Sequence, residues 1–148
     1  MNNEQILKEQ LARFKDKYGL TVGWRLEKNS RIILEHLHDD EEIKYAFYAQ
    51  KNASSFNILG TAVIAVTNKR LIIGRDRVVI GYFFDSITPD MFNDLKVKSG
   101  IIWGKIEIDT VKEFTILSNI DKRALTEIER EITSAMMELR DTISLENR

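Results

Sequence analysis

The side chains best suited to chemistry in this chain are cations and a hydroxyl near two predicted turns: Lys51, Ser54, Arg75 and Arg77. The strands predicted on either side place the turns 51–57 and 74–77 at the same end of a sheet. Ammonium, guanidinium and hydroxyl groups bind phosphate or carboxylate oxygens through charge-assisted hydrogen bonds. These residues therefore predict an anion-binding end, and charges that are merely solvated in turns are the alternative interpretation.

Metal or acid–base chemistry would depend on the two histidines of the chain, His36 and His38, which stand before Asp39 and Asp40. Imidazole and carboxylate groups are suitable zinc ligands. A helix is predicted here, and residues two apart do not share a helix face, so we interpret this segment as a solvated helix end. We therefore expect no metal site.

The remaining composition indicates neither an enzyme nor a nucleic-acid-binding protein. The seven glycines form no phosphate-binding loop or dinucleotide motif, and there is no cysteine for thiolate catalysis. The 22 lysine and arginine residues balance 23 aspartate and glutamate residues, so the net charge is −1 and no global field attracts nucleic acid. We expect no catalytic residues, no cofactor and no nucleic-acid partner.

The chain also carries no pattern typical of export or of a membrane span. Its first residues lack a basic segment followed by an apolar one, and no apolar run approaches the roughly 20 residues of a membrane helix. The absence of cysteine fits a reducing compartment. We therefore expect a cytoplasmic protein.

Apolar periodicity predicts two helices in an N-terminal extension, residues 1–40. One face of a helix over 4–18 holds the apolar residues Leu7, Leu11, Phe14 and Tyr18. A shorter second helix is expected to begin at Asn29 or Ser30, because both residue types are good N-caps.

From Glu41 onward the apolar period changes to two, which is typical of strands. Seven short strands are predicted over 41–49, 58–67, 70–75, 78–84, 94–98, 102–108 and 111–117. The second and third strands form a hairpin across Asn68 and Lys69. A final helix over 121–140 carries an apolar stripe of Leu125, Ile128, Ile132, Met136 and Leu139.

Several segments resemble the bacterial pleckstrin-homology domain family, in particular its YokE-like group: 40–42, 66–72, 98–102, 105–108 and 119–122. The resemblance implies an α+β, mainly β fold, namely a seven-stranded antiparallel PH-like barrel capped by a C-terminal amphipathic helix. The chain then divides into the helical extension 1–40, the barrel with its helix 41–140 and a tail 141–148. The resemblance also implies a basic pocket at the open end of the barrel, although the apolar second strand departs from the inositide-binding pattern.

Strand alternation places two aromatic side chains, Tyr48 and Trp103, on outward faces, and such residues are enriched at interfaces. The alternative is that the N-terminal helix covers the flank that carries Trp103. We expect a non-enzymatic interaction module that binds a protein partner, or forms a homo-oligomer, through an exposed sheet edge. The competing hypothesis is a peripheral adaptor for anionic membrane or phosphorylated ligands that uses Lys51, Arg75 and Arg77.

Overall fold

The structure, a computed structural model, describes residues 1–51, 60–77 and 80–147. Within these residues, antiparallel strands form one seven-stranded sheet with the order β4-β3-β2-β1-β7-β6-β5. The strands are β1 (Ile43–Lys51), β2 (Thr61–Thr67), β3 (Leu71–Asp76), β4 (Tyr82–Ile87), β5 (Phe92–Ser99), β6 (Trp103–Thr110) and β7 (Phe114–Asp121). The helices are α1 (Asn3–Lys17), α2 (Leu26–His36) and α3 (Leu125–Glu146), with a 3₁₀ turn at Lys122–Ala124.

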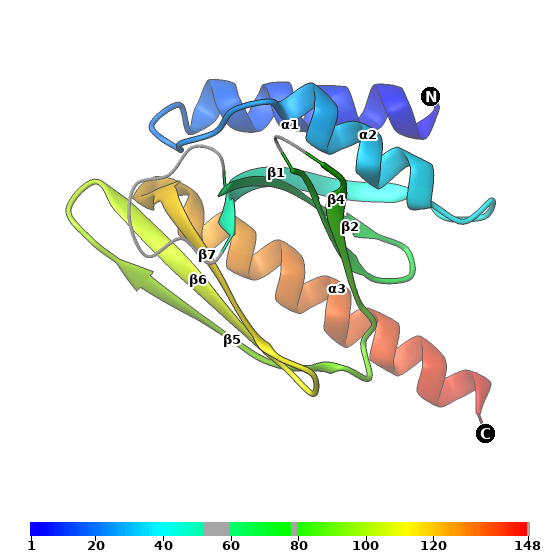
Figure 1. The fold of residues 1–148 in the computed structure, drawn as a ribbon. Helices are drawn as coiled ribbons and strands as arrows, with labels where there is room; N and C mark the ends of the chain where they lie inside the picture. The colour runs from blue at the N-terminus through cyan, green and yellow to red at the C-terminus, as the bar shows by residue number, and fades with distance from the viewer. Residues whose placement is uncertain (52–59, 78–79, 148) are drawn as a thin grey trace.

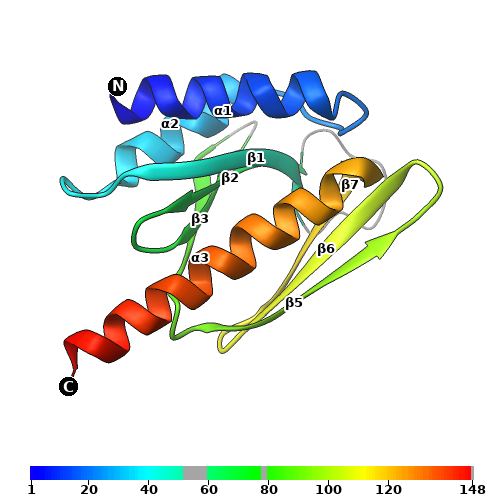
Figure 2. The same cartoon turned by 180° about the vertical axis from the view of Figure 1, so that it is seen from behind.

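The sheet curls into a half-barrel that has helices on both sides (Figure 1). Helices α1 and α2 cover the outside of the first strands, whereas α3 lies in the opening between the two halves of the sheet (Figure 2). Strands β4 and β5 stand at the two ends of the strand order and do not pair with each other. The predicted fold, mainly β with a C-terminal helix and an N-terminal helical extension, is confirmed.

Strands β1 to β3 are buried on both faces, which explains their near-continuous apolar sequences. All residues of β2 are buried. The predicted hairpin is confirmed, because Val66 of β2 pairs with Leu71 of β3 across the turn at Asn68. A Cβ atom at Gly74 would lie 3.0 Å from Cδ1 of Ile33, so glycine lets α2 approach β3 this closely.

The apolar stripe of α3 lies against the inside of the half-barrel, as predicted. Four of its residues are buried and Leu139 is half-buried; the buried ones are Leu125, Ile128, Ile132 and Met136. The predicted end of this helix at residue 140 is wrong, because α3 continues to Glu146. No glycine or proline follows Arg140 to stop it.

The predicted starts of the second helix and of the seventh strand are also wrong, because polar side chains there form hydrogen bonds that the sequence pattern does not predict. Helix α2 begins at Leu26, so Asn29 does not cap it. The Asn29 amide instead donates to the carbonyl oxygen of Thr61 (3.1 Å) and accepts from the N–H of Asp76 (2.7 Å). Strand β7 begins at Phe114 rather than at residue 111, because a turn closed by a side chain precedes it.

That turn is held by Thr110, whose hydroxyl oxygen accepts from the N–H of Glu113 at 3.1 Å. Val111 is consequently exposed. Strand β4 is also shifted, from the predicted 78–84 to Tyr82–Ile87. Residues 78 and 79 lie outside the described part, and Gly81 adopts a φ of +79°, which favours glycine in the turn before β4.

A buried ion pair joins the start of β1 to the β2–β3 turn. Arg70 donates from Nε to Oε2 of Glu41 (2.9 Å) and from Nη2 to Oε1 (3.0 Å). The same guanidinium donates to the carbonyl of His36 and to the hydroxyl of Ser86, and Thr67 donates to Glu41. Burial raises the pKa of the Glu41 carboxyl, but the hydrogen bonds from Arg70 and Thr67 outweigh it and hold the pKa below 4.5.

Replacing the buried carboxylate should destabilise the fold. We expect Glu41→Gln to lower the free energy of unfolding by about 3 to 5 kcal/mol, because the Arg70 charge then stays buried without its counter-charge. The exposed control Glu42→Gln should change it by less than about 0.5 kcal/mol. Urea unfolding followed by circular dichroism measures both values.

The pH dependence follows from the lowered pKa of Glu41. A carboxyl whose folded pKa is depressed stabilises the protein above its unfolded value of 4.5, and this contribution is lost as the pH falls through the folded pKa. The difference between wild type and Glu41→Gln should therefore shrink below pH 4.5. A difference that stays constant down to acid unfolding would contradict the ionic role of Glu41.

A charge in the α3 stripe should abolish the fold. Ile132 is fully buried, so Ile132→Asp places an unpaired carboxylate in the core and is expected to cost more than about 4 kcal/mol. We expect no cooperative thermal transition for this variant, whereas Met137→Asp at an exposed position of α3 should melt cooperatively. An unchanged melting curve for Ile132→Asp would contradict the packing of α3.

Candidate functional site

Strands β3 and β4 bring two arginines and one aromatic ring together at one end of the sheet. Arg75 lies opposite Phe83 in the strand register, and its guanidinium carbon is 4.6 Å from the centroid of the Phe83 ring. The guanidinium carbon of Arg77 lies 5.2 Å from the same centroid. An aromatic ring attracts cations, so Phe83 holds two neighbouring positive charges that repel each other.

Arg75 is the more enclosed of the two cations. Its Nε atom is buried and has no hydrogen-bond partner among the described residues. Burial lowers the pKa of Arg75 below its ordinary value, and repulsion by Arg77 lowers it further. Within residues 1–51, 60–77 and 80–147, neither arginine forms an ion pair, so together they can attract an anion.

The other two predicted anion ligands do not add free charge to this pair. Lys51, the last residue of β1, lies at the same end of the sheet, but its Nζ is 3.1 Å from Oδ2 of Asp85 in β4. The side chain of Lys51 is largely buried, and Asp85 neutralises its charge. Ser54 lies outside the described residues.

Exposed apolar side chains adjoin the two arginines at the beginning of β4. Ile80, Tyr82 and Phe83 are all exposed large apolar residues. Strand β4 pairs only with β3, so its other edge is open within the described part of the chain. The sequence interpretation missed this surface because it placed the fourth strand several residues too early. The run of three consecutive aromatic residues, Tyr82 to Phe84, was the available signal.

The predicted outward position of Tyr48 is wrong. Tyr48 is only 2% exposed, and its ring centroid lies 5.4 Å from that of Phe14 in α1. The backbone at Gly23 also comes so close that a Cβ there would lie 2.4 Å from the Tyr48 ring. Both faces of β1 are covered, so strand alternation does not separate an exposed face from a buried one.

Trp103 lies against the loop that follows α1. Its Nε1 donates to the carbonyl oxygen of Leu20 at 2.6 Å. The loop, rather than helix α1 itself, therefore makes this contact with Trp103, and the indole is half-buried. The N-terminal extension packs on its own sheet, chiefly through α1 against β1 and α2 against β3.

The histidine segment serves the packing of α2. The ring of His36 stacks on Phe84 with centroids 4.1 Å apart. Its Nδ1 lies 2.8 Å from the carbonyl oxygen of Ile32, and its Nε2 lies 3.2 Å from the hydroxyl of Tyr82. Across the described residues, no group of three or more His, Cys, Asp or Glu side chains is arranged to hold a metal ion.

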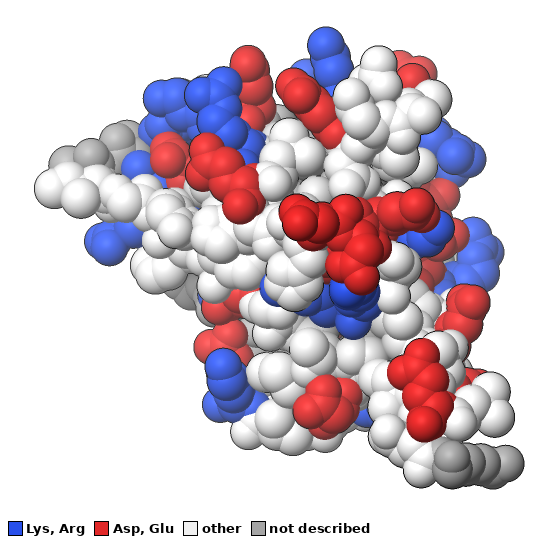
Figure 3. Space-filling model, turned by 90° about the vertical axis from the view of Figure 1, so that its right-hand side faces the viewer, with Lys and Arg blue, Asp and Glu red and all other residues white. Residues whose placement is uncertain are grey.

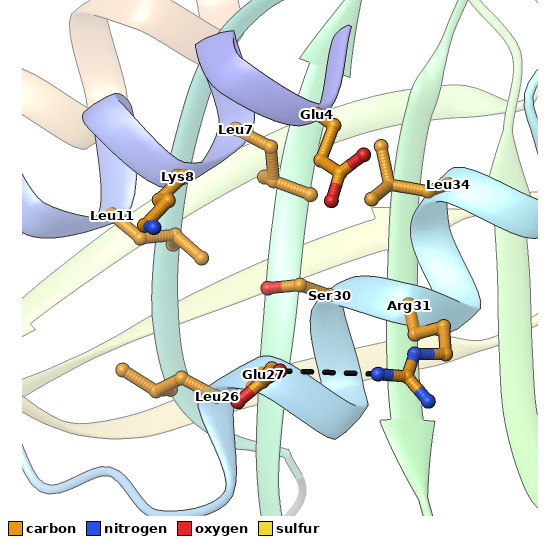
Figure 4. Close-up of a pocket in the computed structure, with 9 residues that line it drawn as sticks. All are labelled: Glu4, Leu7, Lys8, Leu11, Leu26, Glu27, Ser30, Arg31 and Leu34. Carbon is orange, nitrogen blue, oxygen red and sulfur yellow. Dashed lines mark ion pairs between the residues drawn. The ribbon is translucent and has the colours of Figure 1, made fainter.

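A groove of about 560 Å³ lies between α1 and α2 (Figure 4). Its lining residues are Glu4, Leu7, Lys8, Leu11, Leu26, Glu27, Ser30, Arg31 and Leu34. Leucines form the apolar walls, and Oε1 of Glu27 lies 3.8 Å from Nη2 of Arg31 at the rim. The polar side chains of this groove do not converge on one point apart from that pair, so it lacks the arrangement of a catalytic site.

The charges elsewhere on the surface are mixed. On the side of the molecule shown in Figure 3, small clusters of acidic and basic side chains lie next to one another. This pattern agrees with the net charge of −1. Any attraction for an anion therefore depends on local groups such as Arg75 and Arg77.

The fold is that of a pleckstrin-homology-like domain, a curled antiparallel sheet followed by one C-terminal helix. The model of the bacterial PH domain family matches residues 37–133, and this chain belongs to that family. The narrower YokE-like group stays a prediction. None of the helices in the described residues is long and apolar enough to cross a membrane.

Two of the solved structures that resemble the chain contain pleckstrin-homology domains. A pleckstrin homology domain from Shewanella amazonensis is 19% identical with a TM-score of 0.47, and the similarity covers 74% of this chain and 86% of that one. A DUF1696 family protein with a pleckstrin-homology domain from Shewanella loihica is 15% identical with a TM-score of 0.48, over 78% and 93% of the two chains. The comparison with curated proteins gives no match.

Proposed function

We propose that this protein is a non-enzymatic interaction module that binds an extended segment of a partner protein at the open edge of β4. The observation that supports the proposal most directly is the coincidence of an unpaired strand edge with exposed Tyr82 and Phe83. An edge strand presents backbone N–H and C=O groups that pair with an added strand. Aromatic side chains beside it supply apolar contact area.

The two arginines add a preference for acidic partners. Arg75 and Arg77 flank Phe83, so a bound segment that crosses Phe83 would meet both guanidinium groups. A carboxylate there would accept charge-assisted hydrogen bonds. A second copy of this chain is the other partner that the open edge accommodates.

The proposal includes no chemical step. Both ring nitrogens of His36 lie close to other groups of the protein, and His38 is an exposed residue next to the Glu41 carboxylate. Arg75 has the cation Arg77 and the Phe83 ring beside it, which is a binding rather than a catalytic arrangement. A cytoplasmic location, consistent with a chain without cysteine, is part of the proposal.

Site-specific photo-crosslinking in cells that express the protein tests the β4 edge. A photo-reactive phenylalanine analogue at position 82 should yield a discrete adduct, and the same group at Phe114, which is equally exposed at a distant turn, should not. Phe83→Lys should reduce the adduct at least fivefold, because it removes the apolar contact and adds edge repulsion. Adducts of equal yield at positions 82 and 114 would contradict the proposal.

The mass of the adduct separates the two kinds of partner. A covalent dimer of the chain indicates self-assembly, and light scattering at high micromolar concentration should then show a dimer. An adduct of another mass indicates a different protein.

A second candidate function is a peripheral adaptor for an anionic membrane or phosphorylated ligands at Lys51, Arg75 and Arg77. The buried, unpaired Nε of Arg75 within the described residues favours it. The ion pair between Lys51 and Asp85 weakens it, since two rather than three charges remain. Each basic residue near an anionic surface contributes about 1 kcal/mol.

Sedimentation with vesicles across a salt series tests this candidate. Arg75→Ala/Arg77→Ala should weaken binding to anionic vesicles by about 2 kcal/mol, or roughly 30-fold, and the effect should diminish with salt. Lys8→Ala/Lys28→Ala, which removes two exposed charges from α1 and α2, serves as the control. Binding that the arginine variant retains in full would exclude these residues as the membrane site.

A further inference from the structure

The turn between β5 and β6 carries two exposed isoleucines in place of the polar residues that turns prefer. Ile101 is 89% exposed and Ile102 is 45% exposed, and they follow Ser99 and Gly100 in the chain. Glycine, proline, asparagine, aspartate and serine dominate such turns. Single exposed apolar residues are common, but two neighbouring β-branched residues at the tip of a hairpin form a small exposed apolar surface.

This tip projects from the body of the molecule. In Figures 1 and 2, which show opposite sides, the β5–β6 hairpin extends beyond the neighbouring strands and away from α3. Its base is anchored, because the N–H of Lys122 donates to the carbonyl oxygen of Ile102 at 3.1 Å and Trp103 donates to Leu20. The tip is therefore a convex part of the surface whose base is held by these hydrogen bonds, and the exposed Leu20 lies next to it.

Basic residues surround the apolar tip and outnumber the acidic ones. The cations on the two strands and at the start of the 3₁₀ turn are Lys96, Lys98, Lys105, Lys122 and Arg123. The carboxylates among them are Glu107, which lies 3.0 Å from Nζ of Lys98 and 3.6 Å from Nζ of Lys105, and the buried Asp121. Asp121 forms an ion pair with Arg123 at 2.6 Å, and Glu107 is shared by Lys98 and Lys105. Five cations and two carboxylates leave a net charge of +3 around the tip.

We infer that the β5–β6 tip is a contact site for the surface of an anionic lipid bilayer. The isoleucines enter the interfacial region, and the surrounding ammonium groups pair with lipid phosphates. Trp103 then lies at the level of the headgroups, where indole rings are favoured. A convex tip suits a deformable surface, whereas recognition of a peptide uses a groove or a strand edge. This inference does not depend on the β4 edge or on Arg75.

Fluorescence of Trp103 tests the inference directly. The variant Trp24→Phe leaves Trp103 as the only tryptophan of the chain. It is titrated with vesicles of 30 mol% phosphatidylglycerol in phosphatidylcholine, and with vesicles of phosphatidylcholine alone. We expect a blue shift with the anionic vesicles, weakened by added salt, and little change with the neutral ones.

Matched variants in the same background locate the contact. Ile101→Ser/Ile102→Ser should weaken vesicle binding at least tenfold, because two apolar side chains no longer leave water. Val111→Ser/Phe114→Ser, which changes two exposed apolar residues at a different turn, should bind as the parent does. Lys8→Ala/Lys28→Ala, which removes two exposed charges from α1 and α2, should also bind as the parent does.

Three outcomes overturn the inference. The first is no binding of the parent to anionic vesicles at low salt. The second is equal binding by the parent and Ile101→Ser/Ile102→Ser, with folding of both verified by circular dichroism. The third is a blue shift of Trp103 with polyglutamate but not with vesicles, which would identify an acidic protein segment as the occupant.

Discussion

Burial of β1, β2 and β3 on both faces is the constraint on which the rest of this structure depends. The core of the half-barrel covers one face of these strands, and α1 and α2 cover the other (Figure 1). Two-sided burial demands apolar side chains at almost every position, and a glycine where a helix comes closest, at Gly74. It also makes an unpaired charge costly there, and the buried Glu41 and Arg70 form an ion pair.

Because the centre of the sheet is enclosed, the surfaces that we propose for recognition lie at its margins. Strand β4 has one sheet neighbour within the described residues, and its first residues, Tyr82 and Phe83, are exposed. Arg75 lies near the end of β3, where burial lowers the pKa of its guanidinium and no carboxylate of the described residues forms an ion pair with it. The β5–β6 turn is the other margin, and it is apolar at its tip and basic around it.

The element order was readable from local patterns, since period and turn chemistry act over a few residues. The β2–β3 hairpin follows from two apolar runs around Asn68, and the stripe of α3 follows from its helical spacing. The predicted boundaries of helices and strands were wrong where a side chain forms hydrogen bonds that the local pattern does not predict. Asn29 has the residue type of a helix N-cap, yet its side chain forms hydrogen bonds with the backbone of Thr61 and Asp76, which are far away in the chain.

The candidate site could be inferred from the sequence only in part. The alternating direction of successive strands placed Arg75 and Arg77 at one end of the sheet, but it did not reveal which residues they contact. That Asp85 neutralises Lys51, and that Phe83 lies beneath both guanidinium groups, depends on the register between β3 and β4. The position of Tyr48 could not be predicted for a similar reason. The alternation of side chains along a strand defines the two faces of the sheet, but it does not say which elements cover each face. Composition and period are local and set the class of fold, whereas exposure and charge pairing are long-range and arise only when the helices and strands pack.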